Sequence, residues 1–139
     1  MTPTQSELIE RLAGALREST GLRLAVPFGS TARGTRRPDS DLDVGIIPVD
    51  PETSLGTELD LQNRLEQACE RSVHLVRLDR ASTLRKWKVA TEGRLLVSNP
   101  PHSWPRFVAM SAIEYAEFAP QLEQAEERFR ARLAETGQA

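Results

Sequence analysis

The chain contains a single cysteine and few aromatic residues, and both shortages limit what it can be. Cys69 has no second cysteine in the sequence, so neither a disulfide framework nor a thiolate metal site can form within the chain. Aromatic side chains make up 5% of 139 residues, which leaves a lean core for the one domain that this length accommodates. We therefore expect one domain without disulfides, in which Cys69 is a small buried side chain.

The chain also lacks an excess of charge and any long apolar run. Eighteen basic against twenty acidic side chains leave a formal charge of −2, which disfavours nucleic acid as the main partner. No apolar run approaches the length of a membrane span, and acidic residues stand early in the N-terminus in place of a signal-peptide segment. We expect a cytoplasmic protein that does not contact a membrane.

The chain is organised around a polar loop between two apolar segments. The segments Leu22–Phe28 and Leu42–Ile47 are predicted to be strands, and the loop between them is rich in glycine, serine, threonine and arginine. Gly29 allows the backbone to turn, and Ser30 is a favourable N-cap for a short helical segment over Thr31–Gly34. Unpaired backbone N–H groups at such a turn would face an anion.

Two carboxylates follow this loop. Asp41 and Asp43 are two residues apart on the second predicted strand, so both side chains should leave the same face, with Cα atoms roughly 6.5 Å apart. Neighbouring carboxylates repel each other, and a hard divalent cation between them relieves the repulsion. Mg²⁺ prefers carboxylate oxygens together with substrate phosphates. The order of turn and acids therefore predicts metal-assisted nucleotidyl transfer, with Mg²⁺ held by Asp41 and Asp43.

Two other interpretations of the same residues are weaker. Gly29 and Gly34 have the spacing of a P-loop, but Thr35 and Arg36 occupy the positions where that motif requires lysine and then serine or threonine. Alternatively, the acids could simply solvate an edge strand beside an ordinary turn. The occurrence of both features in this order and spacing favours the catalytic interpretation.

The pattern is that of a known superfamily. Gly29-Ser30, ten intervening residues and Asp41-Leu42-Asp43 resemble the signature of the DNA polymerase β-like nucleotidyltransferases. Within that superfamily, the chain from about residue 8 to residue 133 is most similar to the minimal nucleotidyltransferase antitoxins of HEPN–MNT toxin–antitoxin pairs. The resemblance implies a third carboxylate on the strand that follows the next helix.

That third carboxylate is missing here. A helix is expected from Thr57 to Arg71 and a strand over Ser72–Leu78, where His74 stands at the position of the family's third acid. An imidazole can accept a proton, but it is a poorer Mg²⁺ ligand than a carboxylate. Both a degenerate or structural role and a working role as base or ligand remain open for His74.

The last third of the chain is predicted to be helical. A helix over Arg80–Arg94 carries basic residues beside Trp87, which either bind triphosphate or RNA or form a solvated face over a buried tryptophan. A helix over Pro105–Leu133 must be kinked or split at Pro120. Its apolar stripe packs on the domain, on a partner helix, or on both.

The predicted fold class is α/β, with a small mixed sheet packed by helices. We expect residues 1–104 to form a nucleotidyltransferase domain and residues 105–139 to form a C-terminal helical extension. The predicted catalytic residues are Asp41, Asp43 and His74, and the predicted nucleotide-binding residues are Gly29, Ser30 and Arg33.

The resemblance also implies substrates and partners. It implies that AMP passes from ATP to a hydroxyl, on a tyrosine in this family, of a partner HEPN ribonuclease toxin in a hetero-oligomer. The resemblance and the site leave two alternatives. One is an antitoxin that neutralises its toxin by binding alone, and the other is a small-molecule nucleotidyltransferase, which would usually carry an extra acceptor-binding domain.

Overall fold

The computed structural model describes residues 3–34 and 40–137 of the chain. Residues 35–39, which include the Thr35 and Arg36 of the P-loop comparison, lie outside the described residues. In chain order the elements are α1 (Gln5–Glu18), β1 (Leu22–Pro27), α2 (Ser30–Arg33), β2 (Leu42–Pro48), α3 (Leu55–Cys69), β3 (Val73–Arg77), the 3₁₀ helix η1 (Leu78–Arg80), α4 (Thr83–Glu92), β4 (Val97–Ser98) and α5 (Ser103–Glu135).

The four strands form one mixed sheet in the order β3-β2-β1-β4. β1 pairs antiparallel with β2 on one side and with β4 on the other. β2 and β3 run parallel, and α3 forms the crossover between them, as parallel neighbours require. This arrangement confirms the predicted α/β fold with a small mixed sheet.

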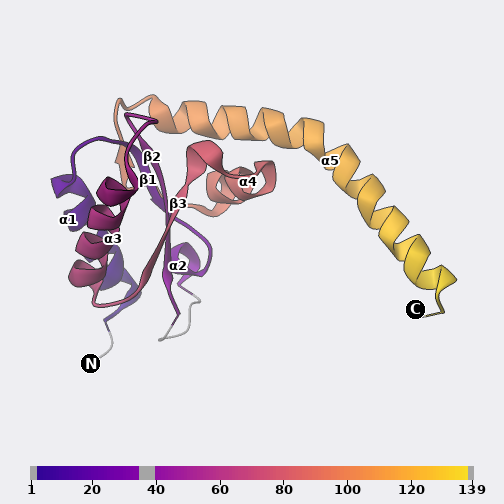
Figure 1. Ribbon diagram of the computed structural model, residues 1–139, viewed down its shortest axis with the longest axis horizontal. Helices are drawn as coiled ribbons and strands as arrows, with labels where there is room; N and C mark the ends of the chain where they lie inside the picture. The colour runs from indigo at the N-terminus through magenta and orange to yellow at the C-terminus, as the bar shows by residue number, and fades with distance from the viewer. Residues whose placement is uncertain (1–2, 35–39, 138–139) are drawn as a thin grey trace.

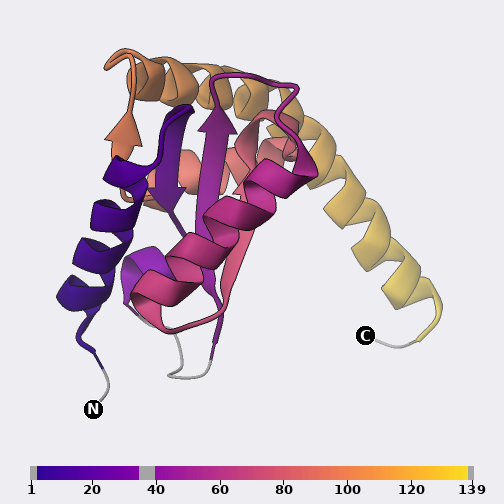
Figure 2. The same cartoon turned by 60° about the vertical axis from the view of Figure 1, so that its left-hand side comes forward.

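Helices cover both faces of the sheet and give the domain two cores (Figures 1 and 2). On one face α1 and α3 pack on the sheet through residues such as Leu12 and Leu65, which are 0% exposed. On the other face α4 and the start of α5 contribute Val89 and Phe107. Alternate residues of β2 and β3 point to opposite faces, so each strand supplies both cores.

Side-chain caps explain where several helices begin. Thr4 and Glu7 form a capping box at the start of α1. The Ser54 side chain accepts a hydrogen bond from the Thr57 N–H, so α3 begins at Leu55, two residues before the predicted start. The Ser82 side chain likewise caps α4, which therefore begins later than the predicted Arg80.

The predicted third strand is shorter in the structure. β3 ends at Arg77 because Leu78, predicted as its last residue, begins a 3₁₀ turn that buries its side chain completely. His74, the second residue of β3, lies within the strand as expected. The short β4 consists of Val97 and Ser98.

α5 is one continuous helix of 33 residues, with Pro120 inside it. The prediction of a kink or a split is thus resolved, because the helix is not divided, and Figure 1 shows it bending partway along its length. Its first half packs on α4 and β1, whereas residues 123–137 are exposed and project beyond the domain. Among the described helices, none combines the length and the apolar character that a membrane span requires.

Candidate active site

The turn after β1 is built on the conformation of Gly29. This residue has φ 61° and ψ −142°, a backbone geometry that is essentially restricted to glycine. A Cβ atom placed on Gly29 would lie 3.5 Å from Oδ2 of Asp43. The carboxylate of Asp43 therefore lies close beside the glycine turn, although 14 positions separate the two residues in the sequence.

The prediction that Ser30 caps the short helix α2 is wrong. Gly29 occupies the N-cap position without a side-chain cap, and Ser30 is the first residue of the helix. The helix closes through a hydrogen bond from the Arg33 N–H to the Gly29 carbonyl oxygen, 3.1 Å. The Ser30 hydroxyl has no hydrogen-bond partner among residues 3–34 and 40–137, so it can bond a ligand beside the turn.

Asp43 is fixed at both of its backbone groups. Its carbonyl oxygen accepts a hydrogen bond from the Phe28 N–H, 3.1 Å, and its own N–H donates to the hydroxyl oxygen of Thr31, 2.8 Å. Both partners belong to the segment that forms the turn. The position of the carboxylate is thus coupled to the position of the turn.

His74 lies beside Asp43 on the neighbouring strand. The two residues are paired in the parallel register of β2 and β3, and Nδ1 of His74 lies 3.3 Å from Oδ1 of Asp43. The His74 side chain is 55% exposed and that of Asp43 is 31% exposed, so this contact faces solvent. The structure therefore brings together the predicted third-acid position and one of the two predicted acids.

Asp41 lies at the edge of this group. β2 begins at Leu42, so the prediction that Asp41 is part of the strand is wrong by one residue. Its side chain is exposed and forms no ion pair or hydrogen bond within the described part of the chain. That Asp41 shares a face with Asp43 stays a prediction.

The residues present fit a metal ion that arrives with its ligand. No three acidic, histidine or cysteine side chains in the described ranges lie close enough together to form a complete metal site. Mg²⁺ is usually held by one or two carboxylates and takes further oxygens from substrate phosphates and water. Oδ2 of Asp43 lies against the glycine turn, so a phosphate bound at that turn could share a cation with the carboxylate.

The predicted cationic residues are engaged with other elements. Nη1 of Arg33 lies 3.1 Å from Oε2 of Glu92, which ties α2 to the end of α4. On α4, Lys86 pairs with Glu114, and the ring of Trp87 stacks on Tyr115 with centroids 4.7 Å apart. Trp87 therefore belongs to the packing between α4 and α5, but it is only partly buried, and not the core residue that the structural alternative predicted.

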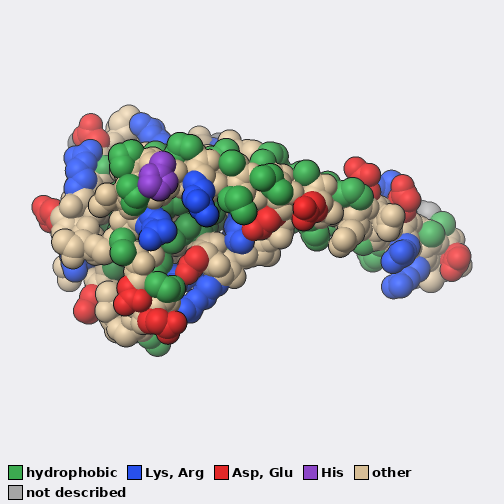
Figure 3. Space-filling view, turned by 90° about the horizontal axis from the view of Figure 1, so that it is seen from above, with side chains coloured by type: hydrophobic (Ala, Val, Ile, Leu, Met, Phe, Trp, Pro, Cys, Tyr) green, Lys and Arg blue, Asp and Glu red, His purple; other side chains and the backbone are tan. Residues whose placement is uncertain are grey.

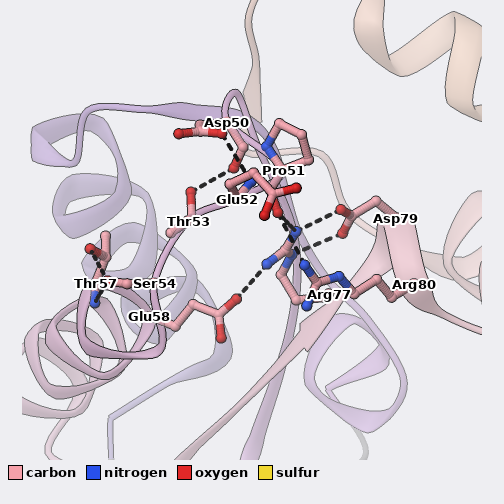
Figure 4. Close-up of polar contacts among 10 residues, drawn as sticks. All are labelled: Asp50, Pro51, Glu52, Thr53, Ser54, Thr57, Glu58, Arg77, Asp79 and Arg80. Carbon is pink, nitrogen blue, oxygen red and sulfur yellow. Dashed lines mark hydrogen bonds and ion pairs between the residues drawn. The ribbon is translucent and has the colours of Figure 1, made fainter.

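A second polar cluster, which sequence reasoning missed, lies at the opposite ends of β2 and β3 (Figure 4). Arg77 donates to Glu58 and Asp79 at 2.7 Å each and to the Pro51 carbonyl oxygen. The hydrogen bond to Asp79 raises the pKa of Arg77, against the opposing effect of burial. Burial alone would raise the pKa of Asp79, but the hydrogen bond and charge of Arg77 lower it below its ordinary value.

Known proteins resemble this chain in sequence. The family model described as polymerase beta nucleotidyltransferase matches residues 10–102. The protein adenylyltransferase MntA of Shewanella oneidensis is 33% identical over 75 residues, which are 54% of this chain and 53% of that protein. The chain thus spans about half the length of this curated relative.

Solved structures share the fold. A chain of a toxin–antitoxin structure with AMP-PNP matches with a TM-score of 0.63 at 24% identity, over 89% of this chain and 99% of its own length. A structure of tri-AMPylated Shewanella oneidensis HEPN toxin with MNT antitoxin matches with a TM-score of 0.56 at 22% identity, over 88% and 95%. A minimal nucleotidyltransferase matches with a TM-score of 0.58 at 27% identity, over 66% and 95%.

Proposed function

From the premise that this chain belongs to the polymerase β nucleotidyltransferase family, we propose that it is an antitoxin that transfers AMP from ATP to a partner HEPN-family toxin. The acceptor would be a hydroxyl group, on a tyrosine by the family resemblance. The observation that carries the proposal is the closeness of the Asp43 carboxylate to the Gly29 turn, because it would bring a phosphate-binding backbone beside a metal-binding side chain. The MntA relative is a protein adenylyltransferase, which supports the same reaction for this chain.

Each end of the site has a separate task in this reaction. The Gly29 turn and the Ser30 hydroxyl would bind the terminal phosphates of ATP, and Asp41 and Asp43 would hold Mg²⁺. The ion would neutralise phosphate charge while it is bound. Arg33 would add positive charge only if it left Glu92.

His74 is in position to act on the acceptor. Its Nδ1 contacts Asp43, and this contact orients the ring, so that Nε2 could take the proton of the attacking hydroxyl. The hydroxyl oxygen then forms a bond to the α-phosphorus, the bond to the bridging oxygen of pyrophosphate breaks, and pyrophosphate leaves. A reaction that consumes ATP would take place in the cytoplasm.

The C-terminal extension, residues 105–139, would contact the toxin while residues 1–104 carry the reaction. Phe129 and Leu133 are 62% and 38% exposed on the projecting half of α5. Seen from above in Figure 3, hydrophobic side chains spread along the first half of this helix, and charged side chains of both signs gather at its far end. An exposed apolar stripe with a charged border is typical of a helix that packs against another protein.

The proposal is tested by measuring whether the chain transfers AMP to its partner protein. The chain is purified with the product of the neighbouring gene, incubated with ATP and Mg²⁺, and the partner is examined by mass spectrometry for added AMP. We expect an adduct with the native chain and none with Asp43→Asn. A stable complex without any adduct would contradict the enzymatic proposal.

One observation favours a second candidate, an antitoxin that acts by binding alone. His74 adds no negative charge where the family pattern has a carboxylate, and this could leave the site too weak to transfer AMP. The two candidates differ in the effect of Asp43→Asn on growth of cells that express both proteins. An enzyme loses toxin neutralisation with this substitution, whereas a protein that acts by occlusion keeps it.

A further inference from the structure

Thr31 is the most deeply buried polar side chain of the candidate active site. It is 1% exposed, although it lies in a short helix of four residues between the two central strands β1 and β2. Its hydroxyl oxygen accepts the hydrogen bond of the Asp43 N–H at 2.8 Å. A polar group buried in this way is stable only with its hydrogen bond in place, because water cannot substitute for the missing partner.

A second contact holds Thr31 from the other side. The side-chain amide of Gln5, the first residue of α1, donates a hydrogen bond to the Thr31 carbonyl oxygen. The same side chain packs on Gly34 at the end of α2, where a Cβ atom would lie 3.4 Å from it. α1 therefore supports α2 at Thr31 and at Gly34.

Together these contacts link the two functional halves of the site. Thr31 follows Ser30 directly, so it moves with the turn that would bind phosphates. Through its hydroxyl it fixes the backbone of Asp43, the residue that would bind the metal ion. No other side chain in the described ranges hydrogen-bonds the backbone N–H of Asp43.

We propose that Thr31 is a positioning residue for AMP transfer, which sets the distance between the phosphate-binding turn and the carboxylate of Asp43. This proposal rests on the proposed function, because the distance matters only if both parts hold the same nucleotide. Small displacements of reacting groups reduce rates by as much as about 100-fold. A residue that touches no substrate can therefore control the rate through Asp43.

The test compares Thr31→Val with Thr31→Ser. Valine has nearly the shape of threonine but cannot accept the Asp43 hydrogen bond, whereas serine keeps the hydroxyl. We expect Thr31→Val to lower kcat for AMP transfer by about 10- to 100-fold and to raise the Mg²⁺ concentration required for half the maximal rate. In the Thr31→Ser variant, both values should stay near those of the native chain.

A matched control separates positioning from stability. Ser111 on α5 is also 1% exposed and lies outside the site, so Ser111→Ala should leave kcat unchanged in the folded protein. Amide exchange of Asp43, followed by NMR, should become faster in Thr31→Val and stay slow in Thr31→Ser. An unchanged kcat in Thr31→Val, together with faster exchange at Asp43, would overturn the positioning role.

The proposed function can fail separately from this inference. If the native chain transfers no AMP, calorimetry of Mg²⁺-dependent ATP binding replaces the rate as the measurement. Weaker binding in Thr31→Val with normal binding in Thr31→Ser would support the inference even then. Equal binding in the native chain and both variants, or no ATP binding at all, would overturn it.

Discussion

The two polar clusters at opposite ends of β2 and β3 differ in how completely their charges are matched. At one end, the Asp43 carboxylate contacts one side chain within the described ranges, that of His74 at 3.3 Å, and its other oxygen lies beside the Gly29 turn. At the other end, Arg77 is 11% exposed and is shared among two carboxylates and a backbone carbonyl. The open cluster can accept a ligand, whereas the closed cluster joins β3, α3 and the loop between β2 and α3.

The strongest test of the open cluster is Asp43→Asn. The amide keeps the shape of the side chain but removes the negative charge that a cation needs. We expect AMP transfer to fall by at least about 100-fold, with little change in Tm, because among the described residues the Asp43 carboxylate contacts only the partly exposed His74 ring and no lysine or arginine. Transfer assays and thermal denaturation of the same samples measure both quantities. A decrease in Tm as large as that caused by a core substitution would show that Asp43 stabilises the fold instead.

The matching test of the closed cluster is Arg77→Met. This substitution keeps the apolar part of the side chain but leaves Glu58 and Asp79 without their cation. Because the pair is largely buried, we expect the free energy of unfolding to fall by about 3 kcal/mol. Chemical denaturation checks this value. The rate of AMP transfer per folded molecule should stay unchanged, and a large fall in kcat would show that the two clusters are coupled.

The closed cluster should also give the protein a defined acid sensitivity. Interaction with Arg77 lowers the pKa of Asp79 in the folded state. The resulting stability is fully present above the ordinary carboxyl pKa of about 4 and is lost as the pH falls through the lowered value. Asp79→Asn should therefore reduce stability at pH 7, because the amide cannot make the charge-assisted hydrogen bonds that the carboxylate accepts from Arg77. Denaturation curves of the two proteins should converge in strong acid, and a constant difference would contradict this assignment.

The smallest effect is expected from changing His74, which could sharpen the open cluster. His74→Asp supplies the carboxylate of the family pattern beside Asp43, and it should raise the transfer rate by about tenfold if metal binding limits the reaction. His74→Ala is the matched control. Initial rates at several Mg²⁺ concentrations show whether metal binding limits the reaction or whether His74 acts as the base. A lower rate in both variants would identify His74 as the working base.

The parts of the site that depend on residues close together in the chain could be predicted from the sequence. The glycine turn and the strand that carries Asp43 follow from motif spacing and alternation along strands, whereas the place of His74 in the site came from the family resemblance. The cap was misassigned to Ser30 because serine is a common N-cap, whereas here Gly29 adopts a conformation restricted to glycine.

The remaining parts depend on contacts between distant segments. Thr31 contacts Asp43 across 12 positions, and Gln5 contacts Thr31 across 26 positions. Neither contact has a sequence signal, because threonine and glutamine usually lie at the surface. The Arg77 cluster was missed for the same reason, since Glu58 lies 19 positions before Arg77 and becomes its neighbour only when α3 packs beside β3.

Pro120 marks a point at which the long terminal helix α5 can bend. Proline has no N–H for the carbonyl of Ala116, so the helix lacks one backbone bond near the point where it leaves the domain. The segment beyond it is roughly 24 Å long at about 1.5 Å per residue. A tilt of about 10° at this point would displace the tip by about 4 Å. The part of α5 after Pro120 could thus contact partners of slightly different size, while the distance between Gly29 and Asp43 stays the same.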